Sequence, residues 1–333
     1  MLAAILYHQV SIHDSTGDLD VLRQCVAVEN ALRRLGYNTV RIPLNLNLAN
    51  ARSALIDAAP DVVFNLVETL AATDRLMPLA TILLESLDLP FTGAGTLALL
   101  ATTHKLAAKQ HMHTVQLPTP GWLPSGQSSW QGLAVPERQP RTAVIKAVCE
   151  HASLGLTDDS VIQLHPAPQT PLSDLLEERT QHFGTPFFAE EFIEGREFNL
   201  SLLADDGQPV VLPPAEIQFL DFPPDKPRIV GYAAKWDETA AEYRQTPRTF
   251  HFPAADRPLL DELQALARRC WNVFNLKGYA RVDFRVDEDG QPWILEINVN
   301  PCLSPEAGFA AALTQQGLSL DDAVQRIVED AFR

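Results

Sequence analysis

The feature that most constrains the fold is a hairpin pattern near the C-terminus. An Asp-Gly pair at residues 289–290 separates two apolar runs, and such a pair favours a two-residue type I′ turn, because both central residues of that turn need positive φ. With this turn, Asp283 lies opposite Glu296 on the partner strand. By the same register, Arg281 lies opposite Asn298. Side chains alternate along a strand, so all four point to one face of the hairpin.

This face predicts a metal site. Two carboxylates that face each other across a hairpin, with Cβ atoms about 5 Å apart, repel each other unless a cation lies between them. Oxygen ligands from Asp283, Glu296 and Asn298 suit Mg²⁺, which keeps its other positions for water and phosphate. The alternative interpretation is an ordinary hairpin with a solvated acidic face.

A lysine inside an apolar strand points to an anionic ligand. Lys146 lies within the run 143–148, and a charge at such a buried place needs a partner. The following loop, 150–155, contains Ser153 and other small residues, which suit a loop that closes over phosphates with its backbone N–H groups. The pattern predicts a cation directed at a nucleotide phosphate. The alternative is a rim lysine whose stem packs while its head reaches water.

Paired acids end another predicted strand. Glu190 and Glu191 are followed by a turn at Gly195, and the chain restarts with Glu197 before a second apolar run. We interpret this segment as a hinge, where backbone groups around 191–193 meet a purine edge and Glu197 accepts ribose hydroxyls. The alternative is a solvated strand edge.

Composition restricts the partners. The chain has 26 Lys and Arg against 42 Asp and Glu, and the net charge of −16 argues against nucleic acid or an anionic membrane surface as a partner. ATP is compatible with this charge, because it needs only a local cluster of cations. The four cysteines are scattered without a C-x-x-C pair, which predicts reduced thiols in a cytoplasmic protein. Residues 1–7 resemble a buried strand rather than a signal peptide.

The order of apolar patterns predicts an α/β protein of three lobes. Strand-like runs at 3–7, 39–42 and 62–66 alternate with helical spacing at 19–35 and 76–87, which predicts a small parallel sheet with helices on its faces. Further along we expect helices at 96–113 and 258–274 and strands at 142–148, 186–192 and 198–203. The lobes are expected at 1–95 (N-terminal, α/β), 96–189 (central) and 190–333 (C-terminal). The polar stretch 221–253, which carries Lys235, is long and irregular, as is typical of a lid.

Taken in order, these segments resemble the ATP-grasp enzymes, and within them the D-alanine–D-alanine ligase group. The matching segments are 91–95, Lys105, 118–120, Lys146 with the loop 150–155, 190–197, Lys235, 278–284 and 295–298. The resemblance implies an ATP-grasp fold, with a Rossmann-like parallel-sheet lobe followed by two α+β lobes that clasp ATP.

The resemblance also implies a role for each matching residue. The cofactors would be ATP and one or two Mg²⁺ ions, with Mn²⁺ as an alternative metal. In this sequence, Lys105, Lys146 and the loop with Ser153 would hold the phosphates, Glu190, Glu191 and Ile193 would contact adenine, Glu197 would hold the ribose, Lys235 would approach the γ-phosphate, Arg281 would stabilise the phosphorylated intermediate, and Asp283, Glu296 and Asn298 would ligate the metal.

Departures from the group's pattern fall in the half of the site that holds amino acids. His151 and Ala152 replace glycine and serine, Trp236 replaces a tyrosine, and Cys302 replaces a glycine. The group's N-terminal glutamate is matched only loosely, by Asp18 or Asp20. We therefore expect a relative that is not a dedicated D-alanine–D-alanine ligase. Cys302 is interpreted as a packing residue rather than a nucleophile.

The function that this implies is an ATP-dependent, ADP-forming carboxylate–amine ligase. It would form an amide through an acyl phosphate, with a small-molecule carboxylate and a small-molecule amine, both amino-acid-like, as substrates. One alternative is an ATP-grasp ligase or kinase that acts on a peptide or another small carboxylate. The other is a non-catalytic nucleotide-binding protein. The apolar helix faces of the first lobe are compatible with a homodimer.

Overall fold

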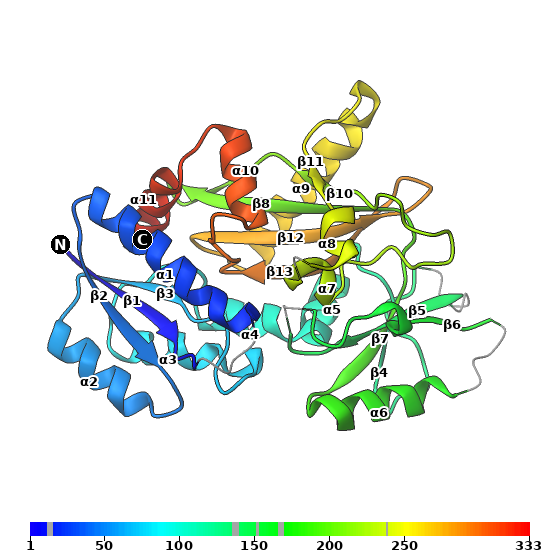
Figure 1. The fold of residues 1–333 in the computed structure, drawn as a ribbon, viewed down its shortest axis with the longest axis horizontal. Coiled ribbons are helices and arrows are strands. Elements are labelled where there is room, and N and C mark those ends of the chain that lie inside the picture. The colour runs from blue at the N-terminus through cyan, green and yellow to red at the C-terminus, as the bar shows by residue number, and fades with distance from the viewer. Residues whose placement is uncertain (12–15, 135–139, 151–152, 166–169, 238) are drawn as a thin grey trace.

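The structure is a computed structural model of the chain. It describes residues 1–11, 16–134, 140–150, 153–165, 170–237 and 239–333. Three β-sheets follow one another along these residues, with helices packed around them (Figure 1). Among the described helices, none combines the length and the apolar character that a membrane crossing requires.

The first sheet is parallel, as the alternation of strands and helices predicts. Its strand order is β2-β1-β3, and the expected ranges overlap its elements. Helix α2 was not predicted, because only Ala51 and Leu55 of it are buried and its apolar period is weak. The elements are β1 (Leu2–His8), α1 (Thr16–Arg34), β2 (Asn38–Leu44), α2 (Leu48–Ala58), β3 (Val62–Leu66) and α3 (Pro78–Ser86).

The single helix expected at 96–113 is wrong, because the chain forms two helices there. These are α4 (Thr96–Thr103) and α5 (Lys105–Thr114), separated at His104, which has φ −90° and ψ 95°. The Nδ1 atom of His104 accepts a hydrogen bond from the backbone N–H of Ala107 and caps α5. The backbone N–H of Lys105 donates to Val148 at 2.9 Å, so the break directs the start of α5 to the end of the strand that carries Lys146.

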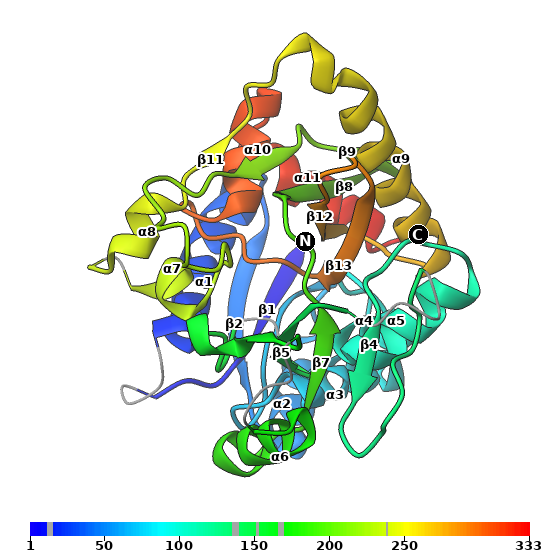
Figure 2. The ribbon, with the colours of Figure 1, turned by 90° about the vertical axis from the view of Figure 1, so that its right-hand side faces the viewer.

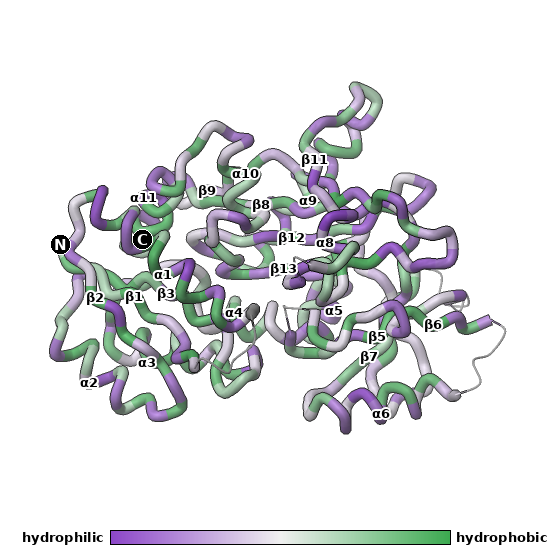
Figure 3. The backbone as a smooth tube through the Cα atoms, viewed as in Figure 1, coloured by the Kyte–Doolittle hydropathy of each residue, from purple (hydrophilic) through white to green (hydrophobic). Residues whose placement is uncertain are grey.

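The second sheet is antiparallel, with the strand order β4-β7-β5-β6. Helix α6 covers one face, and hydrophobic and hydrophilic residues alternate in blocks along it, as expected for a helix with one buried side (Figure 3). Phe187 and Ala189 pack under α6, whereas the neighbouring Phe188 and Glu190 point to the other face of β7. The elements are β4 (Trp122–Pro124), β5 (Thr142–Ala147), β6 (Val161–Gln163), α6 (Leu172–Phe183) and β7 (Phe187–Glu191).

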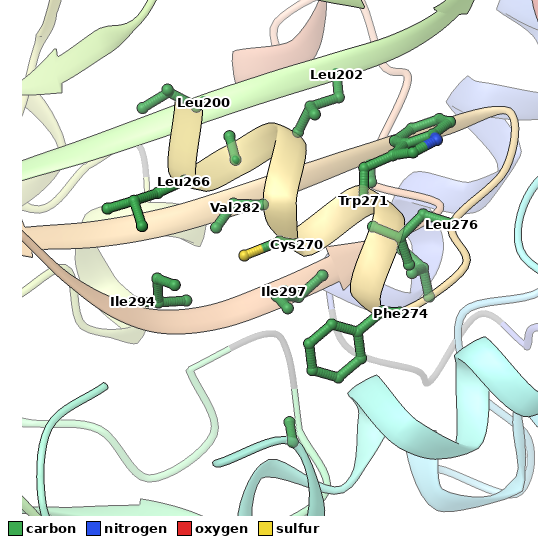
Figure 4. Close-up of a cluster of buried hydrophobic side chains, with 14 of the residues drawn as sticks. Leu200, Leu202, Leu266, Cys270, Trp271, Phe274, Leu276, Val282, Ile294 and Ile297 are labelled. Carbon is green, nitrogen blue, oxygen red and sulfur yellow. The ribbon is translucent and has the colours of Figure 1, made fainter. Parts of the chain in front are cut away.

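The third sheet has the strand order β11-β10-β8-β12-β13, with β9 paired to β8. Helix α9 packs on one face of it, where Leu266, Cys270 and Phe274 lie against apolar side chains of β8, β12 and β13 (Figure 4). The stretch 221–253 is more ordered than expected, since it contains two short helices and a short strand. The elements are β8 (Arg196–Asp205), β9 (Gln208–Val211), β10 (Ala215–Ile217), α7 (Tyr232–Trp236), α8 (Ala241–Gln245), β11 (Arg248–Thr249), α9 (Arg257–Val273), β12 (Tyr279–Val286) and β13 (Pro292–Val299).

The register predicted for the hairpin is confirmed, but its two-residue turn is wrong. Arg281 pairs with Asn298, and Asp283 pairs with Glu296. The strands are joined by the five residues 287–291, and of the Asp-Gly pair only the glycine has positive φ. The carboxylate of the first loop residue accepts two backbone N–H groups of the loop and stabilises this wider turn.

A β-bulge restores the register. Next to the turn, Phe284 pairs with Ile294, which is one residue out of step with the pairing of Asp283 and Glu296. Leu295 is therefore left without a partner on β12. A bulge inserts one extra residue in one strand and redirects the side chains around it. As a result, Ile294 and Ile297 both enter the core, while Leu295 and Glu296 both face the other side of the sheet.

The last two helices, α10 (Gly308–Gln316) and α11 (Leu320–Asp330), return to the first lobe. Arg34 at the end of α1 makes a bidentate ion pair with Asp321, at 2.7 Å for both contacts. Val324 and Ile327 of α11 share one apolar cluster with α1, β1 and β3. The three expected lobes follow the three sheets in sequence order, although β7 runs past residue 189, and their boundaries stay a prediction.

Candidate functional site

One cleft collects the residues that the sequence assigns to the site. Its volume is about 680 Å³, within the range of small-molecule sites, and all three sheets contribute to its walls. The structure brings the predicted residues together here, while their individual roles stay predictions. The predicted residues that line the cleft are Lys105, Lys146, Ser153, Glu190, Glu191, Ile193, Glu197, Lys235, Arg281, Asp283, Glu296 and Asn298.

Strand alternation places the charged hairpin residues in this cleft. Along β12, Val282 and Phe284 are buried under α9, so Arg281, Asp283 and Arg285 point to the opposite face. The same sheet thus carries an apolar core on one face and the charged wall of the cleft on the other, and α9 in Figure 4 marks the core face.

The acidic pair on the hairpin is held by neighbouring donors. Arg281 binds both oxygens of Asp283, with Nε to Oδ1 at 2.7 Å and Nη2 to Oδ2 at 2.8 Å. The side-chain amide of Asn298 donates to Asp283 Oδ2 at 3.0 Å and to Glu296 Oε1 at 3.2 Å, and so bridges the two carboxylates. Lys105 Nζ lies 3.3 Å from Glu296. Burial opposes the charge of Arg281, but Asp283 outweighs it and raises the pKa of the guanidinium.

The oxygen atoms on this face of the hairpin fit a hard divalent cation. Among the described residues, no group of three His, Cys, Asp or Glu side chains is placed to hold a metal. The hairpin instead offers two carboxylates and one amide oxygen, and this oxygen-only set suits Mg²⁺, which takes its other ligands from water and phosphate. The cations Arg281 and Lys105 already bind these two carboxylates, so the place is one where positive charge is favoured.

A buried triad of charges holds Lys146. Its Nζ lies 2.5 Å from Glu190 Oε1, and Lys109 Nζ lies 2.7 Å from the other oxygen, Oε2. Burial alone would raise the pKa of Glu190, but the two ammonium groups lower it and keep the carboxylate charged. Lys109 falls within the helix expected at 96–113, but no role was predicted for it. Its four-residue spacing from Lys105 was the available signal, since this spacing puts both on one helix face.

Arg285 is a second residue of the site for which no role was predicted. Its Nη2 lies 2.9 Å from Glu197 Oε2, and its Nη1 donates to the carbonyls of Ile193 and Gly195. The guanidinium carbon also lies over the rings of Phe192 and Phe219, 5.5 and 5.6 Å from their centroids. Arg285 thus fixes the hinge segment. Its position two residues after Asp283, on the same strand face, was the signal.

The segment 221–253 lies over the cleft and contacts both other lobes. Ser153 Oγ donates to the carbonyl of Val230 at 3.2 Å. On the other side, a Cβ on Gly17 would meet the ring of Trp236 at 3.3 Å, so α7 packs against the start of α1 (Figure 2). Burial lowers the pKa of Lys235, which lines the cleft from the same helix.

Comparison with known proteins identifies the family. The family model described as the D-ala D-ala ligase C-terminus matches residues 143–329. The chain belongs to the D-alanine–D-alanine ligase family. The D-alanine–D-alanine ligase of Methylococcus capsulatus is 28% identical over 317 residues, which cover 93% of this chain and 91% of that protein. That of Carboxydothermus hydrogenoformans is 29% identical over 316 residues, with 92% of each chain covered.

Solved structures share the fold. A D-alanine–D-alanine ligase from Bacillus anthracis complexed with ATP superposes with a TM-score of 0.72 at 19% identity, covering 100% of this chain and 98% of that one. D-alanyl-alanine synthetase A from Vibrio cholerae gives a TM-score of 0.73 at 14% identity, covering 100% and 99%. The predicted ATP-grasp fold is confirmed, and the protein is an ATP-dependent, ADP-forming carboxylate–amine ligase.

One expectation is wrong. The departures from the family pattern predicted a ligase that is not dedicated to D-alanine, but relatives that match over nine-tenths of the chain are D-alanine–D-alanine ligases. A few substitutions are a weaker indicator of the substrate than similarity over the whole chain. At the place of the family's tyrosine, the ring of Trp236 packs against Gly17. His151 and Ala152 lie outside the described residues.

The half of the cleft that lies next to the first lobe is acidic. Ser304 Oγ donates to Asp20 at 2.6 Å, and the Cys302 thiol lies 3.0 Å from the same carboxylate. Burial raises the pKa of this thiol well above its usual value, which fits a packing residue and not a nucleophile. Glu68 accepts from Gln24 at 3.0 Å, and burial raises its pKa to about 8. Glu68 was missed, although it follows the carboxyl end of β3, where α/β sheets bind ligands.

Proposed function

We propose that this protein joins two D-alanine molecules into a dipeptide, with conversion of ATP to ADP and phosphate. The observation that carries the proposal is a cleft in which lysines and hairpin carboxylates converge at one end and partly buried acids line the other. The first end suits a nucleotide triphosphate, and the second suits the ammonium group of an amino acid. The names of the relatives supply the identity of that amino acid.

ATP would be held along β5, β7 and β8. Lys105, Lys146 and the loop with Ser153 bind the phosphates, and Lys235 approaches the γ-phosphate from the lid. Backbone groups at Glu190, Glu191 and Ile193 contact adenine, while Glu197, held by Arg285, accepts the ribose hydroxyls. Asp283, Glu296 and Asn298 hold one or two Mg²⁺ ions, for which Mn²⁺ can substitute. When bound, the metal neutralises charge on the β- and γ-phosphates.

The remaining residues act on the amino acids. The carboxylate of the first D-alanine attacks the γ-phosphorus, the bond to the β-phosphate oxygen breaks, and an acyl phosphate forms. Arg281 binds its phosphoryl oxygens, because a planar guanidinium can make two parallel hydrogen bonds. The amine of the second D-alanine then attacks the acyl carbon, loses a proton and displaces phosphate. The lid 221–253 keeps water out, since water would hydrolyse the acyl phosphate.

An ADP-release assay over alanine pairs tests this function. Purified protein with ATP and Mg²⁺ should release ADP with D-alanine and not with L-alanine, and mass measurement should find one D-alanyl-D-alanine per ADP. ADP release that needs no amino acid would favour a simple ATPase. No release with D-alanine would overturn the proposal.

We also propose that the protein works in the cytoplasm, where ATP is available. Its three lobes would be 1–95, 96–189 and 190–333. We further propose that it is a homodimer. Ile82, Leu97 and Leu100 are exposed on the adjacent helices α3 and α4 and form a candidate dimer face. Sedimentation velocity of the wild type and of Leu97→Lys would test it. A wild-type monomer at micromolar concentration would contradict the dimer.

A further inference from the structure

Lys109 is a buried lysine that does not line the cleft. Its side chain is 1% exposed, against 18% for Lys146, which does line it. An ammonium group has three donors, and that of Lys109 makes two hydrogen bonds and one ion pair. Lys109 Nζ binds Glu190 at 2.7 Å, the hydroxyl of Thr119 at 2.8 Å and the carbonyl of Pro120 at 3.1 Å.

These contacts connect two walls of the cleft. The hydroxyl of Thr119 in turn donates a hydrogen bond to the carbonyl of Ile294 at 2.9 Å. Ile294 is the neighbour of Leu295, the bulged residue of the metal-site hairpin. Glu190, on the other side of Lys109, binds Lys146 at 2.5 Å. A continuous chain of buried polar contacts therefore runs from β13 through Lys109 to Lys146.

The charges in this chain do not cancel. Two lysines share one carboxylate, so the group keeps a net charge of +1. Without Lys109, Glu190 and Lys146 would form a neutral pair, and Lys146 would have to break a buried contact before it met a phosphate. With Lys109 bound to the second oxygen, the negative charge of Glu190 is already balanced by a lysine outside the cleft. The remaining positive charge is that of Lys146, which lines the cleft.

We propose that Lys109 is a positioning residue for ATP. It compensates Glu190 and thereby leaves the charge of Lys146 available to the phosphates. This inference rests on the proposed ATP site, since it needs Lys146 to meet a phosphate. A buried unpaired charge is costly, so the same contacts also stabilise the fold, and the test must separate the two effects.

The test is a charge-compensation cycle, with the dissociation constant of Mg·ATP measured by calorimetry. The variants are Lys109→Met, Glu190→Gln and the double variant. Lys109→Met should weaken binding about tenfold or more, because an uncompensated Glu190 then neutralises Lys146, the lysine of this group that lines the cleft. The double variant should regain most of this loss, because glutamine no longer neutralises Lys146. A purely structural role of Lys109 would leave the double variant as weak as Lys109→Met or weaker.

Controls keep the outcomes distinct. Lys277→Met removes the same charge from an exposed position outside the cleft and should leave binding unchanged. If Lys109→Met does not fold, Glu190→Gln and the double variant still decide the question. They should bind Mg·ATP alike, and a further tenfold loss in the double variant would overturn the inference. Equal binding by the wild type and Lys109→Met would overturn this inference alone, whereas a wild type that binds no Mg·ATP would overturn the proposed function.

Discussion

At the scale of single residues, Asp283 is the side chain on which most of the site converges. It accepts hydrogen bonds from Arg281, Asn199 and Asn298, and it is buried. Sequence reasoning found Asp283 because alternation and register fix its face. It gave no role to Lys109 or Arg285, because their importance arises from contacts between segments far apart in the chain.

Asp283→Asn should lower kcat by about 100-fold or more, because an amide supplies neither the charge nor the second oxygen that a metal-bound phosphate site needs. The variant should still unfold cooperatively, since asparagine keeps the shape. Stopped-time ADP measurements with D-alanine check the rate. Asp289→Asn, on the exposed turn of the same hairpin, is the matched control and should retain wild-type turnover.

Glu68 should make stability depend on pH. Its pKa is raised from 4.5 to about 8 by burial, so the folded state holds a proton that the unfolded state releases. The stabilisation is complete below pH 4.5 and is lost as the pH rises through about 8. Glu68→Gln, which cannot titrate, should therefore become more stable relative to the wild type between pH 5 and 8. Urea unfolding at several pH values measures this. A difference in stability between the variant and the wild type that stays constant over this pH range would contradict the assigned shift.

At the scale of elements, the sequence patterns predicted which way the side chains of a strand point better than they predicted where an element ends. The hairpin register followed from an assumed two-residue turn, which does not form, and it came out right because the bulge at Leu295 offsets the wider loop. No local pattern announces that bulge. The strands of the first sheet were predictable from their apolar runs. The break at His104 was not, since it depends on the contact of α5 with the end of β5.

His104→Ala should destabilise the protein by about 1 kcal/mol, because it removes the cap of the helix that carries Lys105 and Lys109. His104→Asn should recover most of this loss, as asparagine is among the best capping residues. Chemical denaturation gives both free energies of unfolding. Equal stability of the alanine variant and the wild type would show that the cap contributes nothing.

At the scale of the whole molecule, the lid joins parts that the chain keeps far apart. Trp236 of its helix α7 packs on Gly17 of the first lobe. Val230, just before α7, accepts a hydrogen bond from Ser153 of the central lobe. Lid closure therefore requires the lobes to be in place together. A lid that closes badly admits water to the acyl phosphate.

Trp236→Ala should uncouple the reaction, so that more than one ADP is released per dipeptide. The indole is the part of α7 that contacts Gly17, and alanine cannot span that distance. Trp236→Phe keeps a ring there and should stay close to one ADP per dipeptide. Parallel ADP and dipeptide measurements give the ratio, and a ratio of one in the alanine variant would refute this sealing role.

The return of α11 to the first lobe has a consequence for how the protein is made. Val324 and Ile327 complete the apolar cluster that α1, β1 and β3 begin, about 300 residues earlier in the chain. While the ribosome is still translating, that cluster has no cover, and the exposed apolar side of α1 is open to chaperones or to aggregation. A chain truncated before residue 320 should therefore fail to fold its first lobe, even though residues 1–95 are all present.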